Sequence, residues 1–233
     1  YAHLHRGMTV HAIDLKRESG RNELARELGR ADVLLTSSRP SALARLGLDS
    51  ERIARDWPRL VWVAIVGEYA PDDELPGHDL TYQAEAGLID GALPPTLWAD
   101  MAGSLMAVEA ALQGLLLRGN GQAGAALHTT VALAEAARFA ALPRRYGLTA
   151  PGALLGGLHP GYQVMPCADG MVAIAALEPH FLEAWQACTG IRPELDAAGQ
   201  IEASRAWCAS RSAVQLTAVA LEHDLPLYAW AQA

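Results

Sequence analysis

Two apolar stretches decide the fold of this chain: 32-DVLLT-36 and 60-LVWVAIV-66. Each has the length of a strand, is apolar on both faces, and ends in polar or flexible residues. The segments 20–29 and 40–47 have the features of helices, because leucines recur at helical spacing in the first and the second lies between a proline and a glycine. Short apolar strands separated by helices predict a parallel sheet that is covered on both sides.

The same pattern continues on both sides of this pair. Upstream, residues 9–15 are predicted as another short strand. Downstream, we expect helices over 79–87 and 100–118, and the second of these is apolar almost all round, which is typical of a central, buried helix. A short strand over 126–131 and a helix over 132–142 follow.

A stretch rich in glycine and proline, 151–161, is the strongest linker signal in the chain. Beyond it, two apolar runs flank the dipeptide Asp169-Gly170, which is a hairpin signal. Further helices are expected from Pro179 onward. The sequence therefore predicts an incomplete large α/β domain over 1–135, a linker over 136–156 and a smaller α+β domain over 157–233.

Composition limits the classes of function. The 233 residues are 51% hydrophobic and 19% charged, which excludes a disordered chain. A net charge of −8 argues against nucleic acid as a partner, so an anionic ligand needs a local group of arginines. The three cysteines are widely spaced and indicate neither a disulfide framework nor a zinc site.

The chain is expected to be soluble and cytoplasmic, without membrane partners. Charged and histidine residues interrupt the first fifteen positions, which is unlike a signal peptide. The longest apolar stretch, 101–117, contains Ser104, Glu109 and Gln113 and is predicted to be too polar for a membrane span. Because the chain opens at Tyr1 without a methionine, we also expect it to be a fragment.

Several residues could carry chemistry, and each also has a structural interpretation. Arg39 and Arg45 lie near a predicted helix start and could hold a phosphate, although a solvated helix face is the more frequent explanation. His78 and Asp79 are more often a surface turn with a capping aspartate than a catalytic unit. Asp100 precedes the long helix, where it could cap that helix, attack a thioester or take a proton.

Capping also competes with catalysis for Glu178, which lies between an apolar strand and a helix that starts with proline. Gly156 and Gly157 could belong to a linker alone. The sequence has no nucleophile elbow, phosphate-binding loop or dinucleotide fingerprint, and no metal site is expected.

Read together, five segments resemble the class III CoA-transferase family, which includes the α-methylacyl-CoA racemases. They occur in the order of the family and cover most of the chain. The best-defined are ADVLLTSSRPSALARLGL at 31–48, GHDLTYQAEAGL at 77–88 and PPTLWADMAG at 94–103; the other two lie at 58–67 and 154–181.

The resemblance implies a role for each candidate residue. Arg39 and Arg45 match arginines that line the CoA nucleotide. His78, Asp79 and Tyr82 match the racemase motif beside the acyl thioester. Asp100 matches the aspartate used throughout the family, Gly156 and Gly157 match a loop that closes over the thioester, and Glu178 matches an acidic residue of the small domain.

This family membership would imply a Rossmann-like fold and a homodimer of interlocked subunits, with coenzyme A as substrate and no permanently bound cofactor. The expected reaction is CoA transfer from an acyl-CoA to a carboxylic acid through an aspartyl intermediate. One alternative is a racemase in which His78 and Asp100 are the two bases. Since the family begins with a strand–helix region that this chain lacks, and continues beyond its end, a non-catalytic CoA-binding remnant or partner-dependent subunit is a third possibility.

Overall fold

The computed structural model describes residue 3 and residues 5–232. The chain divides into two compact units, Tyr1–Ala141 and Leu142–Ala233. Each unit has its own sheet and its own apolar core. The boundary between the units lies inside the stretch 136–156 that the sequence predicts as a linker.

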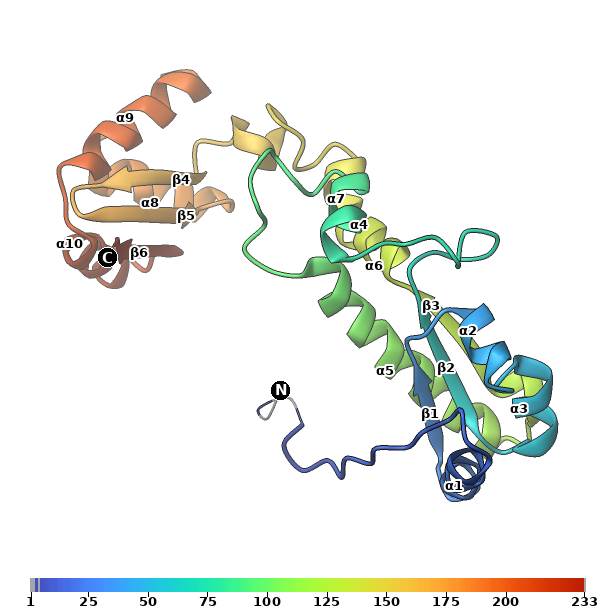
Figure 1. The fold of residues 1–233 in the computed structure, drawn as a ribbon. Coiled ribbons are helices and arrows are strands. Elements are labelled where there is room, and N and C mark those ends of the chain that lie inside the picture. The colour runs from blue at the N-terminus through green and yellow to red at the C-terminus, as the bar shows by residue number, and fades with distance from the viewer. Residues whose placement is uncertain (1–2, 4, 233) are drawn as a thin grey trace. The chain divides into compact units, whose positions relative to one another are not determined.

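A parallel three-stranded sheet organises the first unit (Figure 1). It consists of β1 (Val33–Thr36), β2 (Val61–Val66) and β3 (His128–Ala132), in that order. β2 is the central strand, and the burial of Val61, Trp62 and Val63 explains why this stretch is apolar on both faces. The prediction of a parallel sheet from these stretches is confirmed.

Helices cover both faces of this sheet, with α5 on one side and α2 and α3 on the other (Figure 1). On one face Trp62 packs with Leu28, Leu43 and Ile53. On the other face Val63 packs against Ala107 and Ala110. The helices of the unit are α1 (Glu18–Leu28), α2 (Pro40–Arg45), α3 (Ser50–Asp56), α4 (Asp79–Glu85), α5 (Trp98–Gly119) and α6 (Leu133–Ala140), with a 3₁₀ turn at Gly124–Leu127.

Two expectations about this unit are wrong. Residues 9–13 are irregular rather than a strand, and Val10 is 61% exposed, because no strand among the described residues pairs with their backbone. The helix α5 is not fully buried either. It packs on the sheet through small residues such as Gly114, where a Cβ would strike Val61, while Leu105 and Leu116 on its outer face are each 71% exposed.

The expected polarity of 101–117 also needs correction. Among the residues that the structure describes, α5 is the one helix that is long and apolar enough, by length and composition, to cross a membrane. Ser104, Glu109 and Gln113 are too few to lower its hydropathy below that level. The small residues on its inner face pack against β2.

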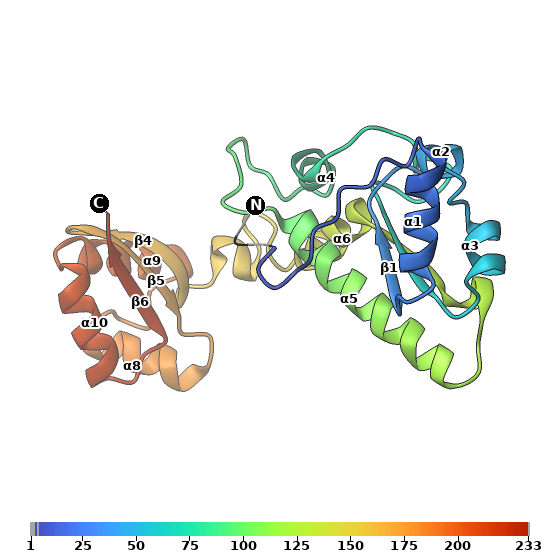
Figure 2. The same ribbon diagram turned by 60° about the horizontal axis from the view of Figure 1, so that its bottom comes forward.

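The second unit is an α+β arrangement around an antiparallel sheet in the order β4-β5-β6 (Figure 2). The hairpin predicted at Asp169-Gly170 joins β4 and β5. Trp185 is fully buried between the helices and the sheet and donates a hydrogen bond to Ser204 Oγ at 3.1 Å. The elements are α7 (Leu142–Arg145), a π-helical turn (Leu154–Leu158), β4 (Tyr162–Cys167), β5 (Gly170–Ala175), α8 (Pro179–Thr189), α9 (Ala197–Ala209), α10 (Ala213–Glu222) and β6 (Leu227–Ala231).

Candidate active site

The start of α5 is capped by a side chain from α4. The Asp79 carboxylate is only 5% exposed, and its Oδ1 accepts hydrogen bonds from the backbone N–H of Ala99 at 2.8 Å and of Asp100 at 3.1 Å. These N–H groups have no partner within the helix, so the carboxylate satisfies them and adds a favourable charge at the helix start. The N-cap residue itself is Leu97, so the prediction that Asp100 caps this helix is wrong.

Asp100 therefore lies in the first turn of α5, with an exposed side chain. Partial burial raises the pKa of its carboxyl above the ordinary value, and the negative charge of Asp79 raises it further, while His78 acts in the opposite direction. A carboxylate with a raised pKa is a stronger base and a better nucleophile than an ordinary aspartate.

His78, rather than Asp79, is the N-cap residue of α4. Its backbone N–H donates to Thr81 Oγ1 at 3.1 Å, and the Thr81 hydroxyl donates back to the His78 carbonyl at 2.7 Å. The His78 imidazole is on an exposed residue and is close enough to affect the ionisation of Asp100. In the structure, His78 and Asp100 therefore interact electrostatically.

Tyr82 interacts with Asp100 and also lies against the loop that follows β2. Its buried hydroxyl lies against Gly67 and Gly77, where a Cβ at either position would strike it. Burial raises the pKa of the phenol, the charges of Glu68 and Asp100 raise it further, and Arg39 lowers it. The phenol therefore stays protonated at neutral pH and remains a hydrogen-bond donor.

A cavity of about 290 Å³ opens at the carboxyl end of β2. In open parallel sheets this edge is where ligands bind. The cavity is lined by Arg39, His78 and Tyr82, together with Ser37, Ser38, Ile65, Val66, Gly67, Asp73, Leu75, Pro76, Gly77 and Leu133. Three of the residues singled out from the sequence thus share one cavity, and Asp100 interacts electrostatically with two of them.

The two arginines differ in position. Arg39 lines the cavity, whereas Arg45 does not, although both are exposed and both act on the carboxylate of Glu74. Glu74 accepts hydrogen bonds from the backbone N–H of Ser41 at 2.7 Å and from its hydroxyl at 2.9 Å. These bonds, and then the two guanidinium groups, lower the pKa of Glu74. Part of the positive charge is therefore balanced within the chain, which the sequence analysis missed.

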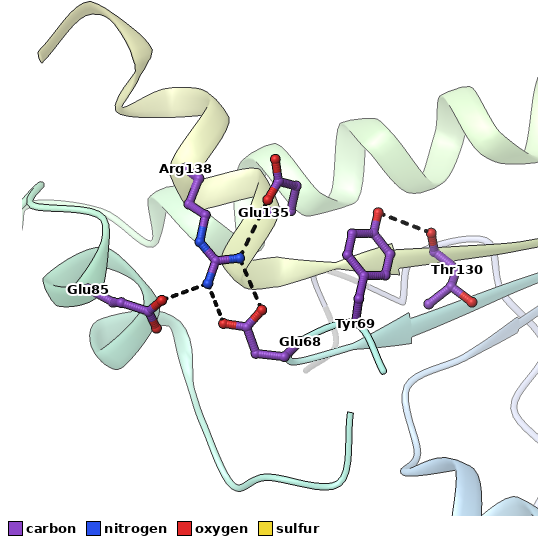
Figure 3. A network of polar contacts seen from close by, with 6 residues as sticks. All are labelled: Glu68, Tyr69, Glu85, Thr130, Glu135 and Arg138. Carbon is purple, nitrogen blue, oxygen red and sulfur yellow. Dashed lines mark hydrogen bonds and ion pairs between the residues drawn. The ribbon is translucent and has the colours of Figure 1, made fainter. Parts of the chain in front are cut away.

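A second unpredicted feature is the ionic network of Arg138 (Figure 3). Its guanidinium binds both oxygens of Glu68, at 2.6 and 3.1 Å, and also contacts Glu85 at 2.6 Å and Glu135 at 3.4 Å. The Glu68 and Glu85 carboxylates keep the pKa of the guanidinium above its usual range. Arg138 and Glu135 both belong to α6, whereas Glu68 follows β2 and Glu85 ends α4. Arg138 therefore ties α6 to both of these elements.

A neighbouring cavity of about 440 Å³ lies between β2, β3 and α2, on the face of the sheet opposite to α5. It shares Ser38, Val66 and Asp73 with the first cavity. His128 lines it, edge-on to Trp62, and burial lowers the pKa of the imidazole. The His128 Nε2 atom has no hydrogen-bond partner among the described residues.

The remaining candidates belong to the second unit. Glu178 is the exposed N-cap residue of α8, and its side chain makes no capping hydrogen bond. Both glycines of the loop have a structural reason: Gly157 has φ of 110°, and a Cβ on Gly156 would strike the Ala150 carbonyl oxygen. Their part in a site formed with Asp100 stays a prediction.

Within the described residues, no group of three or more His, Cys, Asp or Glu is arranged to hold a metal ion. The cysteines are unpaired thiols. Burial raises the pKa of Cys208 to about 12, and it also raises that of Cys188. These two side chains are therefore poor nucleophiles at neutral pH.

Comparison with known proteins agrees with this architecture. The model of CoA-transferase family III matches residues 1–225. The chain is 30% identical to the mouse alpha-methylacyl-CoA racemase over 195 residues, which is 76% of this chain and 51% of that protein. It is also 30% identical to the succinyl-CoA:(R)-benzylsuccinate CoA-transferase subunit BbsE of Thauera aromatica over 205 residues, 79% of this chain and 48% of that one.

The fold is also similar to that of a solved structure. The crystal structure of the hypothetical protein Rv3272 from Mycobacterium tuberculosis superposes with a TM-score of 0.77 at 22% identity, over 97% of this chain and 68% of that one. These relatives include an alpha-methylacyl-CoA racemase and a CoA-transferase subunit. The chain belongs to CoA-transferase family III. It spans about half the length of the two curated relatives described above.

Proposed function

We propose that this chain moves CoA from an acyl-CoA to a carboxylic acid, with Asp100 as the nucleophile. The observation that carries the proposal is the position of Asp100: an exposed carboxylate of raised pKa, in the first turn of α5, electrostatically coupled to two residues that line the cavity at the sheet edge. That cavity is where an acyl thioester would lie.

In the proposed reaction the Asp100 carboxylate attacks the thioester carbonyl carbon, the C–S bond breaks, and CoA thiolate leaves an acyl-aspartyl anhydride. The thiolate then attacks the aspartyl carbonyl carbon, releasing the first carboxylic acid as its anion and forming an aspartyl-CoA thioester. The incoming carboxylate attacks this thioester and displaces the thiolate again. Attack of the thiolate on the new acyl carbon restores Asp100 and gives the new acyl-CoA.

The other residues have supporting parts in this proposal. Arg39 and Arg45 would bind the anionic nucleotide end of CoA, Tyr82 would line the path to Asp100, and Asp79 would hold the start of α5 below the bound thioester. Gly156, Gly157 and Glu178 would be supplied by the second unit, as the family resemblance implies. We further propose a cytoplasmic homodimer with a large CoA-binding domain over 1–135 and a small domain over 157–233.

Racemisation of a 2-methylacyl-CoA is the second candidate, and the pairing of His78 with Asp100 favours it. Both are on exposed residues, and the charge of His78 acts on the Asp100 carboxyl. One group would remove the α-proton of the thioester and the other would return a proton to the opposite face. A transferase needs no base at position 78.

Two incubations separate the two reactions. With (R)-2-methylacyl-CoA in deuterated water, racemisation incorporates deuterium at the α-carbon. Transfer instead gives no exchange, but in hydroxylamine with an acyl-CoA it leaves a hydroxamate on Asp100 that peptide mass spectrometry locates. The Asp100→Asn variant is the control for both signals.

Absence of both signals would overturn catalysis by this chain. A CoA-binding remnant would then still show a thermal shift, since a ligand at 100 times its Kd adds about 2.7 kcal/mol. Absence of that shift as well would overturn the CoA site itself.

A further inference from the structure

Gln83 is a fully buried polar residue between α4 and the segment that leads into α5. Its side chain is 0% exposed, which is unusual for an amide in a region where His78 and Asp100 are exposed. The Gln83 Nε2 group donates to Asp79 Oδ2 one turn earlier in α4. The same group donates to the Thr96 carbonyl at 3.0 Å, just before α5 begins.

The orientation of this amide is fixed by its partners. Both contacts of Nε2 are to oxygen atoms, which accept and cannot donate. Turning the amide over would place Oε1 against those two acceptors, so the nitrogen must face them. Gln83 Oε1 has no hydrogen-bond partner among the described residues. The side chain therefore serves as a double donor, at the cost of a buried oxygen without a partner.

The two oxygens of Asp79 have separate tasks. Oδ1 accepts from the backbone of Ala99 and Asp100, and Oδ2 accepts from Gln83. Asp79 is only 5% exposed, so hydrogen-bond donors of the protein replace the water that its carboxylate has lost. Gln83 supplies the side-chain donor of this set. It also links Asp79 to the Thr96 carbonyl, so that one residue of α4 holds both the side chain that caps α5 and the backbone just before α5.

We propose that Gln83 is a positioning residue for Asp100: it holds the Asp79 carboxylate against the start of α5, and through Asp79 it sets how strongly Asp100 acts as a nucleophile or base. This proposal rests on the proposed function of Asp100. Asp79 is the negative charge that raises the pKa of Asp100, and His78 is the group that lowers it. Tyr82 is the third titratable group of this segment that interacts with Asp100, since the charge of Asp100 raises the pKa of its phenol, and the Glu68 charge raises it as well.

Titration of Asp100 in the full chain tests the inference without any substrate. The carboxyl carbon is followed by NMR in protein labelled with ¹³C-aspartate, and Asp100→Asn assigns its signal. In Gln83→Met, the Asp79 carboxylate loses a donor and is no longer held against the start of α5. Its charge then acts less on Asp100, which should titrate at a pH lower by about 0.5 than in the wild type. Asp79→Asn should give a larger shift in the same direction.

Two further variants make the result specific. Gln83→Glu keeps the shape of the side chain and, when protonated, donates its O–H to Asp79; two buried carboxyls sharing one proton carry the same net charge as the native pair. Asp100 should then titrate close to its wild-type pH. Gln113→Met, the same chemical change on the exposed face of α5, is the matched control and should leave the titration unchanged.

A wild-type titration of Asp100 in a folded Gln83→Met would overturn the inference, because a residue that only fills space would behave in that way. If Gln83→Met does not fold, a shift in Gln83→Glu as large as that in Asp79→Asn would overturn it instead. Since no CoA is present, these outcomes are independent of the trapping and exchange experiments, which test the function of Asp100. In the active enzyme, the acid limb of the kcat/KM profile should move with the titration.

Discussion

The two units of the chain use their apolar side chains differently. The second unit gathers them into one continuous cluster around Trp185, Met165 and Leu216. The first unit has three smaller clusters, and its longest helix leaves Leu105 and Leu116 largely exposed. A continuous core resists change because each side chain has many neighbours, whereas separate clusters leave the relative positions of the elements to other contacts.

In the first unit those contacts are polar. Asp79 and Gln83 join the start of α4 to the start of α5, and Arg138 joins the end of α4 to β2 and α6. The candidate active site lies on these joined elements. Substitutions there are therefore expected to change chemistry before they change the fold, and substitutions in the second core should do the reverse.

The largest expected effect is on turnover in the first unit. Asp100→Asn removes the proposed nucleophile and should lower kcat/KM at least about 10³-fold, while CoA still raises the melting temperature. Glu109→Gln, on the exposed face of the same helix, is the matched control and should keep full activity. If Asp100→Asn turned over at the wild-type rate, Asp100 would not be the nucleophile. The expectation that substitutions in the first unit change chemistry first would then fail.

The largest expected effect on stability is in the second unit. Trp185→Ala empties the centre of its core and leaves the Ser204 hydroxyl without its donor, so unfolding should become easier by about 3–5 kcal/mol. Trp98→Ala, at a site that is 49% exposed on α5, should cost less than about 1 kcal/mol. Chemical denaturation followed by tryptophan fluorescence measures both. Equal losses in the two variants would show that the second core is not the more tightly packed region.

The strands β1 and β2 were predictable because their apolar runs are short and continuous, and the hairpin was predictable from Asp169-Gly170. Of the residues that the family motifs singled out, Arg39, His78 and Tyr82 line one cavity, whereas Asp100 and Arg45 are not among its lining residues. The features that could not be predicted from the sequence alone depend on tertiary contacts. Whether 9–15 becomes a strand depends on a neighbouring strand, and two partners of Arg138, Glu85 and Glu68, lie 53 and 70 residues away in the chain.

The capping of α5 shows the same limit. Asp100 has the residue type and position of an N-cap, and local sequence favours that interpretation. The carboxylate that actually caps the helix, Asp79, comes from twenty residues earlier. Spacing within one helix contains no information about such a contact, and only packing of α4 against α5 creates it.

An intermediate effect is expected from breaking the ionic network. Arg138→Met leaves Glu68 partly buried without its cation and should destabilise the first unit by about 1–2 kcal/mol, with faster amide hydrogen exchange in α4. Arg138→Lys keeps the charge but cannot bind both oxygens of Glu68 in the same way, so its loss should be smaller. Unchanged exchange in α4 for Arg138→Met would mean that the network does not hold that helix.

The smallest expected effect concerns stability and pH at Asp100. Its pKa is raised in the folded chain, so the folded state favours the protonated acid, and this contribution to stability is lost as the pH rises from the ordinary value of about 3.9 through the folded value. Asp100→Asn cannot ionise and avoids that loss. Its melting temperature should equal that of the wild type near pH 3 and exceed it at pH 7, by at most about 2 °C because the side chain is exposed to solvent.

The sign of this difference is what makes the measurement useful. A residue selected for stability would lose melting temperature when replaced, whereas a carboxylate held beside the buried charge of Asp79 should gain it while losing turnover. The comparison repeated in Asp79→Asn provides the check, since removing that charge should abolish part of the gain at pH 7, while the larger part, which comes from burial of the Asp100 carboxyl, remains. If the melting temperature of Asp100→Asn instead falls at pH 7, the folded chain stabilises the Asp100 carboxylate. The surroundings of Asp100, including the Asp79 charge, would then favour its ionised form rather than disfavour it.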